Sequence, residues 1–288
     1  MLEEEKIKRV MENWYADLDR MEQTALWEDG APGFDPGIAG QRQPSVAFLP
    51  VSGTTPRGVV IICAGGAYLC KSSYEGGHVA RFIHAHGMAA AVLDYRVKPY
   101  LLRDSLADAN RSIRLIRSRA AEWGILPDKI AILGFSAGGH LAGMAATLYD
   151  RGSPRADDPV ERISSRPDAA IQCYGSISPA SVPGLEVLLD TGYGAEELER
   201  FSPDRNLQPD SPPFFMWQTG DDDIVPASHI LNMAGRLSDH RIPYEMHIFP
   251  YGPHGAGLAD GSNTDMPPDT HVAQWAGLLV KWLETLGF

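Results

Sequence analysis

The segment KIAILGFSAGGHL, Lys129–Leu141, contains the pattern that decides the expected fold. The apolar run Ile130–Leu133 predicts a strand, and the small and apolar residues after Gly138 predict a helix. Between them lies Gly-x-Ser-x-Gly with Ser136 at its centre, which in this context is typical of a nucleophile elbow. The two glycines remove side chains that would collide across so tight a turn. A Gly-rich turn without chemistry is the alternative, and we expect a reactive serine.

Composition places this chain among globular enzymes. Its 288 residues suit one large domain, and a hydrophobic content of 44% is ample for a sizeable core. The net charge of -12 argues against nucleic acid and anionic membranes as partners.

No apolar run approaches a membrane span, and the charged N-terminus lacks the apolar region of a secretory signal. Cys63, Cys70 and Cys173 lack the spacing of a zinc site or a disulfide framework. We therefore expect a cytoplasmic enzyme that needs neither metal nor cofactor.

The N-terminal part differs in pattern from the rest. Residues 3–24 carry apolar side chains at helical spacing and predict a helix, either packed on the body or serving as a partner or lid element. Residues 29–44 are rich in Gly and Pro and predict an irregular linker. The expected division is therefore an N-terminal extension over 1–44 and a catalytic domain over 45–288.

Strand-like and helix-like segments alternate through the catalytic domain, which predicts a mostly parallel central sheet with helices on both faces. The expected strands are Val46–Val51, Val59–Cys63, Ala89–Tyr95, Ile130–Phe135, Ala169–Tyr174, Phe214–Gln218 and Tyr244–Phe249. The expected helices are near 76–87, 103–123, 138–149, 226–240 and 270–286.

Two segments of this pattern carry further expectations. In the helix near 103–123, Arg111, Arg114, Arg117 and Arg119 lie opposite the apolar face and are expected to be solvated. The proline-rich segment 175–212, with a short helix-like piece at Ala195–Phe201, interrupts the alternation. Such a long segment between two strands is expected to shape the opening of a site.

A serine nucleophile needs a base and an acid that orients the base, in the chain order serine, acid, histidine. The loop after the strand Phe214–Gln218 contains three adjacent acids. Asp222 is favoured because Pro226, four residues later, begins a helix, while Asp221 and Asp223 remain alternatives.

The expected base is His254, because it lies among glycines on the loop that follows the last strand. The other histidines considered lie inside that strand, on a helix or before the serine. They are His247, His229, His240, His78, His84 and His86.

The oxyanion that forms during acyl transfer needs two backbone N–H groups. One is expected from Ala137, the residue after the serine. The other is expected from the loop CAGGAY, residues 63–68, where Gly66 is favoured and Ala67 is next.

From about residue 45 onward the chain resembles an α/β-hydrolase, and within that fold the BD-FAE-type esterase branch that includes bacterial acetylxylan and feruloyl esterases. The resemblance rests on these segments, of which the third is the most specific: CAGGAY (63–68), LDYRV (93–97), RSRAAEWGILPDKIAILGFSAGGHLA (117–142), SPPFFMWQTGDDDIVP (211–226) and FPYGPHG (249–255). It implies a serine carboxylesterase that acts through an acyl-enzyme on a small-molecule ester, with acetylated sugars or xylo-oligosaccharides as the expected substrates. Such enzymes use no metal.

The sequence departs from this branch at three positions. Ala64 and Ala67 stand where relatives usually carry other oxyanion-loop residues, and the Ala67 methyl is expected to narrow the acyl site. Gln218 stands where relatives often carry His, at a position expected not to touch the chemistry.

Five further residues were assigned secondary roles. Glu75 is expected to orient the oxyanion loop or a substrate hydroxyl, with a surface carboxylate as the alternative. His140 is expected to pack behind the site. Tyr68, Tyr74 and Tyr193 are candidate walls for a sugar or aryl group, or simply core residues.

Two other functions fit the same residues. An amidase, formamidase or peptidase would use the same triad, and a non-catalytic binding protein would keep the fold without turnover. The sequence leaves the choice of ester and the formation of a homo-oligomer open.

Overall fold

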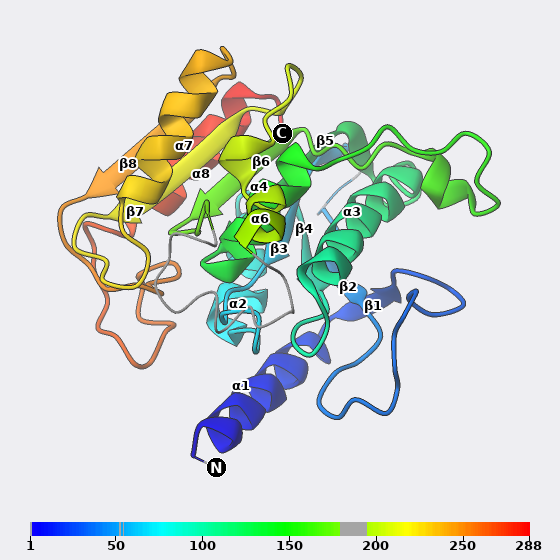
Figure 1. Ribbon diagram of the computed structural model, residues 1–288, viewed down its shortest axis with the longest axis horizontal. Helices are drawn as coiled ribbons and strands as arrows, with labels where there is room; N and C mark the ends of the chain where they lie inside the picture. Colours follow the sequence, from blue (N-terminus) through cyan, green and yellow to red (C-terminus); the bar gives the residue numbers. More distant parts are fainter. Residues whose placement is uncertain (1, 52, 54, 179–194) are drawn as a thin grey trace.

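An eight-stranded sheet forms the centre of the computed structural model, which describes residues 2–51, 53, 55–178 and 195–288 (Figure 1). The strand order is β1-β2-β4-β3-β5-β6-β7-β8. β2 is antiparallel to β1 and to β4, and all other neighbouring pairs are parallel. The strands are β1 (Glu22–Ala25), β2 (Ser45–Leu49), β3 (Arg57–Cys63), β4 (Ala89–Asp94), β5 (Ile125–Phe135), β6 (Ala169–Cys173), β7 (Phe214–Thr219) and β8 (Tyr244–Phe249).

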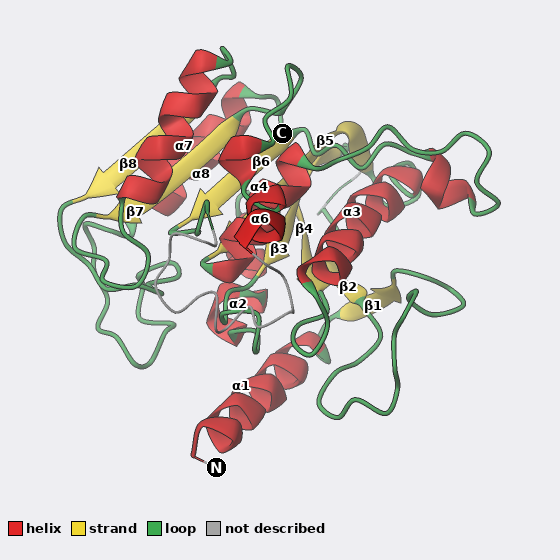
Figure 2. Cartoon of the chain, viewed as in Figure 1, coloured by secondary structure: helices red, strands yellow, loops and turns green. Residues whose placement is uncertain are grey.

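Helices cover both faces of this sheet (Figure 2). One apolar core joins the sheet to α3 (Leu102–Ser118), α4 (Ala137–Thr147) and α7 (Ser228–Asp239). A second core joins it to α1 (Leu2–Leu18), α2 (Gly77–Ala85) and α8 (Gln274–Thr285). The short elements are α6 (Ala195–Arg200), η1 (Ser73–Glu75), η2 (Pro159–Arg162) and η4 (Pro203–Arg205).

The central strands are buried on both sides, which explains why they appear in the sequence as unbroken apolar runs. In β3, Val59 and Ile61 belong to one core and Val60 and Ile62 to the other. Parallel strands covered by helices on both faces need this composition. The predicted fold class is confirmed, and β2 to β8 correspond to the seven predicted strands. β5 is longer than predicted because Ile125 already pairs with Arg57.

The N-terminal segment differs from its prediction. α1 ends at Leu18, and the helix expected to reach residue 24 gives way to β1, which pairs with β2 at the edge of the sheet. Gln23 Nε2 donates to the Leu18 carbonyl at 3.3 Å and so supports the end of the helix. The sequence of β1, EQTA, has no apolar alternation, and the strand therefore gave no signal. The linker over 29–44 has no helix or strand, as predicted. The domain boundary at residue 45 stays a prediction.

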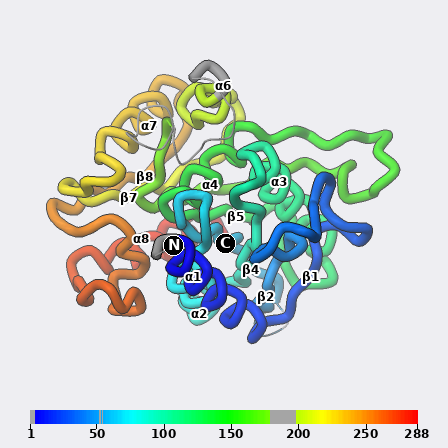
Figure 3. The backbone as a smooth tube through the Cα atoms, turned by 60° about the horizontal axis from the view of Figure 1, so that its bottom comes forward, coloured from blue at the N-terminus to red at the C-terminus, as the bar shows by residue number. Residues whose placement is uncertain are grey.

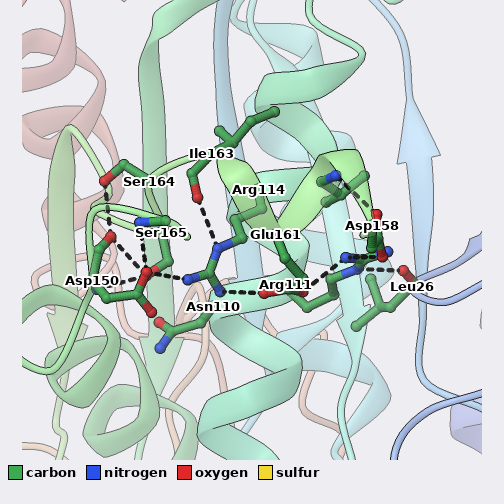
Figure 4. Close-up of polar contacts among 12 residues, drawn as sticks. Leu26, Asn110, Arg111, Arg114, Asp150, Asp158, Glu161, Ile163, Ser164 and Ser165 are labelled. Carbon is green, nitrogen blue, oxygen red and sulfur yellow. Dashed lines mark hydrogen bonds and ion pairs between the residues drawn. The ribbon is translucent and has the colours of Figure 1, made fainter. Parts of the chain in front are cut away.

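The expected solvated face of α3 is wrong at Arg111 and Arg114, which are 4% and 6% exposed. Arg111 Nη1 lies 2.7 Å from both Asp158 and Glu161, and Arg114 pairs with Asp150 and Glu161 (Figure 4). These acids come from a segment that follows α4 and folds over α3. A contact between segments about 40 residues apart leaves no local pattern, so the sequence suggested solvent instead.

α1 lies beside α2 at the carboxyl ends of the parallel strands (Figures 1 and 3). Trp14 of α1 is fully buried, and its ring packs against Gly76, where a Cβ atom would lie 2.5 Å from the ring. The functional loops of an α/β fold emerge at these carboxyl ends. Within the residues that the structure describes, no helix is long and apolar enough to cross a membrane.

Candidate active site

Ser136 occupies the sharp turn between β5 and α4. Its φ of 51° lies in the left-handed region, which is uncommon for a residue with a side chain. A Cβ atom at Gly134 would lie 1.8 Å from the Gly138 carbonyl oxygen, and one at Gly138 would lie 2.0 Å from the Cys63 carbonyl oxygen. The two glycines are therefore required by backbone contacts on both sides of the serine.

Ser136, His254 and Asp222 form one hydrogen-bonded chain. Ser136 Oγ lies 2.8 Å from His254 Nε2, and His254 Nδ1 lies 2.7 Å from Asp222 Oδ2. Asp222 lies on the loop after β7 and His254 on the loop after β8, so the three side chains converge from separate segments. The structure brings together the three residues that the sequence singled out for this role.

Asp222 is held in place by backbone hydrogen bonds. Its side chain is fully buried, and its Oδ1 accepts hydrogen bonds from the backbone N–H groups of Ile224 at 2.9 Å and Val225 at 2.8 Å. The alternatives Asp221 and Asp223 are exposed. A carboxylate can only accept hydrogen bonds, so it holds the His254 proton on Nδ1 and leaves Nε2 facing the serine as an acceptor.

Gln218 makes a contact that the sequence reasoning missed. It was expected not to touch the chemistry, but its Nε2 donates to Asp222 Oδ2 at 2.7 Å, so that expectation is wrong. Its place in the sequence could have indicated this contact, because Gln218 lies on β7 only four residues before Asp222. The side chain is fully buried there.

The other histidines are engaged elsewhere. His229 Nδ1 accepts from the Ile177 N–H at 3.1 Å, and burial lowers the pKa of its imidazole. His247 lies 2.8 Å from Glu245, and His78 lies 2.7 Å from Asp260. None of these three takes part in the contacts to Ser136.

The loop after β3 packs directly against the serine. A Cβ atom at Gly65 would lie 2.9 Å from Ser136 Cβ, and one at Gly66 would lie 2.2 Å from the Cys70 carbonyl oxygen. The φ angle is 138° at Gly66, 54° at Ala67 and 57° at Tyr68, so the loop holds three successive residues of positive φ beside the serine. Ala137 is the first residue of α4, at the positive end of the helix dipole.

Glu75 lies next to this loop, and its side chain is buried, with 2% exposed. The alternative that Glu75 is a surface carboxylate is therefore wrong. Its Oε2 accepts from the Gly65 N–H at 2.7 Å, and its Oε1 accepts from the Tyr174 hydroxyl at 2.6 Å. The Tyr174 oxygen in turn accepts from the Gly257 N–H at 2.9 Å. Burial raises the pKa of the Glu75 carboxyl. The carboxylate thus connects the loop after β3 to the loop that carries His254.

The three candidate tyrosines have different positions. Tyr74 lines the cavity described next, whereas Tyr68 is 4% exposed and does not line it. The Tyr68 hydroxyl donates to His140 Nδ1 at 2.8 Å, and His140 Nε2 donates to the Phe201 carbonyl at 2.7 Å. Tyr68 and His140 therefore pack behind the site. Tyr193, with the rest of 179–194 in the predicted mouth segment, lies outside the described residues.

A cavity of about 380 Å³ opens over Ser136 and His254, within the usual range of small-molecule sites. Its walls come from the loop after β3, from Ile224 and from α1. The helix packs on the body, which was the favoured of the two interpretations, and it also places three side chains, Lys6, Ile7 and Val10, in the wall. The apolar stripe of α1 was the available signal, but the stripe alone does not say what it faces.

No group of three or more His, Cys, Asp or Glu side chains able to hold a metal ion occurs among the residues that the structure describes. Cys63, Cys70 and Cys173 are free thiols.

The elbow, the hydrogen-bonded chain and the loop after β3 lie within or next to a segment that matches one family model. The BD-FAE model matches residues 47–237. The chain belongs to the BD-FAE family. The family match ends before His254. The position of His254 beside Ser136 is therefore known from the structure and not from the family match.

Relatives of this BD-FAE chain have been named as hydrolases. It is 31% identical over 228 residues to endo-1,4-beta-xylanase B of Butyrivibrio fibrisolvens, covering 77% of this chain and 34% of the relative. It is 26% identical over 221 residues to an acetylxylan esterase of Xylanibacter ruminicola, covering 74% of this chain and 43% of the relative. The chain thus spans less than half the length of these two curated relatives.

A solved structure of similar size also matches. The acetyl ester-xyloside bifunctional hydrolase from Caldicellulosiruptor lactoaceticus is 36% identical, with a TM-score of 0.85, over 93% of this chain and 97% of that chain. The predicted α/β-hydrolase fold is therefore confirmed by structure as well as by family.

Proposed function

We propose that this chain is a serine carboxylesterase that removes short acyl groups, acetyl above all, from acetylated sugars or xylo-oligosaccharides. The observation that carries the proposal is the chain of contacts Ser136 Oγ–His254 Nε2–Asp222 at 2.8 and 2.7 Å, with the loop containing Gly66 packed against the serine. The names of the relatives support ester hydrolysis and the sugar substrate.

The first half of the reaction forms an acyl-enzyme. His254 Nε2 accepts the Ser136 proton as Oγ attacks the ester carbonyl carbon, and Asp222 stabilises the imidazolium that results. The negative charge moves to the carbonyl oxygen. The N–H groups of Ala137 and Gly66 stabilise this charge, and Ala67 is the alternative donor to Gly66. His254 then gives the proton to the ester oxygen, the carbon–oxygen bond breaks, and the alcohol leaves.

The second half regenerates the serine. A water molecule gives a proton to His254 Nε2 and attacks the acyl carbon. The tetrahedral intermediate collapses with return of that proton to Ser136 Oγ, and the carboxylic acid leaves. No redox partner or metal is needed to balance these steps.

A substrate panel tests this proposal against the alternatives that the sequence left open. We expect hydrolysis of p-nitrophenyl acetate and release of acetate from acetylated xylo-oligosaccharides, at rates well above those on N-formyl and aminoacyl-arylamide substrates. Faster turnover of the amides would replace the esterase by an amidase, formamidase or peptidase. A preference for acyl chains of eight carbons or more would refute the acetyl assignment, and inertness toward every substrate would point to a non-catalytic binding protein.

A further inference from the structure

Two cavities flank the N-terminal half of α1. The first, of about 380 Å³, lies over Ser136. The second, of about 410 Å³, is lined by Met11 of the same helix together with Gln41 and Val97. Two side chains, Ile7 of α1 and Leu69 of the loop after β3, line both cavities. They form the boundary between the cavity over Ser136 and a second cavity of similar size.

One buried carboxylate holds both sides of this boundary in place. Trp14 Nε1 of α1 donates to Asp94 Oδ1 at 2.9 Å, and Lys71, two residues after Leu69, forms an ion pair with the same oxygen. Lys71 Nζ also donates to the Tyr95 carbonyl at 2.7 Å and lies 5.6 Å from the centre of the Trp14 ring. Trp14, Lys71 and Asp94 are each at most 2% exposed.

This anchor makes the boundary rigid. Removing one partner of a buried ion pair leaves an uncompensated charge, so the pair resists separation. Ile7 and Trp14 are seven residues apart, about two turns, and so lie on the same face of α1. The helix and the loop therefore cannot separate to admit a larger group without breaking contacts to Asp94.

The chemistry indicates which part of the substrate meets this boundary. The leaving oxygen must lie near His254 Nε2, because His254 protonates it, and the carbonyl oxygen must point toward the N–H groups near Gly66. His254 lines one part of this cavity, and Ile7 and Leu69 line another. The acyl group is then directed toward the boundary.

We propose that Ile7 and Leu69 form a partition that limits the length of the acyl group which this enzyme accepts. The proposal rests on the serine esterase function above and identifies the residues that restrict it to short acyl chains. Truncating either side chain connects the catalytic cavity to the second one and gives a longer chain an apolar space.

The test compares wild type with Ile7→Ala, Leu69→Ala and the double variant on p-nitrophenyl acetate, butanoate, hexanoate and octanoate. We expect the ratio of kcat/KM for octanoate to that for acetate to rise about tenfold or more in each single variant, since small changes in a hydrophobic pocket have effects of that order. Lys8→Ala is the matched control, because Lys8 lines only the second cavity and is exposed. Its ratio should equal that of wild type.

Two results would overturn the partition. One is an unchanged ratio in a folded Ile7→Ala or Leu69→Ala variant. The other is a shift confined to acetate esters of longer alcohols, which would place the leaving group there. Ile7→Val and Leu69→Val supply smaller truncations if the alanine variants do not fold. Loss of acetate hydrolysis in Ser136→Ala, measured alongside, keeps a failure of the partition distinct from a failure of the esterase function.

Discussion

The Tyr174 hydroxyl donates to Glu75 Oε1 at 2.6 Å, and Glu75 Oε2 accepts from the Gly65 N–H at 2.7 Å. Gly65 precedes Gly66, the favoured oxyanion donor, and Tyr174 also accepts from Gly257 near His254. A single buried carboxylate therefore links the loop after β3 to the loop that carries His254. We expect Glu75 to position the loop after β3 without touching the substrate, so its replacement should lower kcat.

Glu75→Gln should lower kcat on p-nitrophenyl acetate about 10- to 100-fold. The amide has one acceptor oxygen for two donors, so the loop shifts, and small displacements of oxyanion donors are costly. The change in stability at neutral pH should be small, because removal of a buried carboxylate whose pKa burial raises is offset by the loss of an acceptor for one buried donor. A loss of kcat that only followed a loss of folded protein in thermal unfolding would contradict this role.

Gly138→Ala should destabilise the protein by about 3 kcal/mol or more, because the new methyl would lie 2.0 Å from the Cys63 carbonyl oxygen, and a backbone atom cannot rotate away. Gly235→Ala is the matched control. Gly235 lies in α7 with nothing within 4 Å, so alanine there should raise stability by up to about 1 kcal/mol through helix propensity. Urea unfolding of both variants measures the difference, and equal midpoints would contradict the crowded elbow.

Arg111→Met should destabilise the protein by about 2 kcal/mol. The substitution leaves the Leu26 carbonyl without the Arg111 Nε donor at 2.7 Å and removes the ion pairs with Asp158 and Glu161. Arg103→Met changes an arginine of the same helix that is 68% exposed, and it should cost less than about 0.5 kcal/mol. Equal effects in urea unfolding would restore the solvated face that the sequence suggested.

His140 should make stability depend on pH. Burial lowers the pKa of its imidazole from the ordinary 6.5 to about 4, so the unfolded chain takes up this proton first as pH falls. The stabilisation is complete above pH 6.5 and is lost progressively between 6.5 and 4, by about 3 kcal/mol in all. His140→Gln should show a flatter decline across that window in unfolding at several pH values. Parallel curves for wild type and variant would contradict the assignment.

Much of the fold was predictable because burial on both faces produces long apolar runs. β3 to β7 show such runs, whereas the edge strand β1 contacts only β2 and was missed because EQTA has no such pattern. The arginines of α3 were misplaced for a related reason. A local period shows that Arg111 faces away from the core, but not that a later segment folds over it.

The candidate site also contains residues that the sequence could indicate and contacts that it could not. Ser136, Asp222 and His254 could be selected because each follows a strand at a spacing that the chemistry requires. The wall that α1 provides and the contact of Gln218 with Asp222 depend on where distant segments meet, and no spacing encodes that. The sequence therefore indicated the three side chains that the fold brings together better than the surfaces that line the cavity around them.

The proposed esterase function depends above all on Ser136 as the nucleophile. The most direct measurement is labelling with a fluorophosphonate followed by peptide mass analysis, together with kinetics of Ser136→Ala on p-nitrophenyl acetate. We expect a single label on the peptide that contains Ser136, no label in Ser136→Ala, and a fall in turnover of roughly four to six orders of magnitude. Near-wild-type hydrolysis by Ser136→Ala, or a label on another residue, would contradict it.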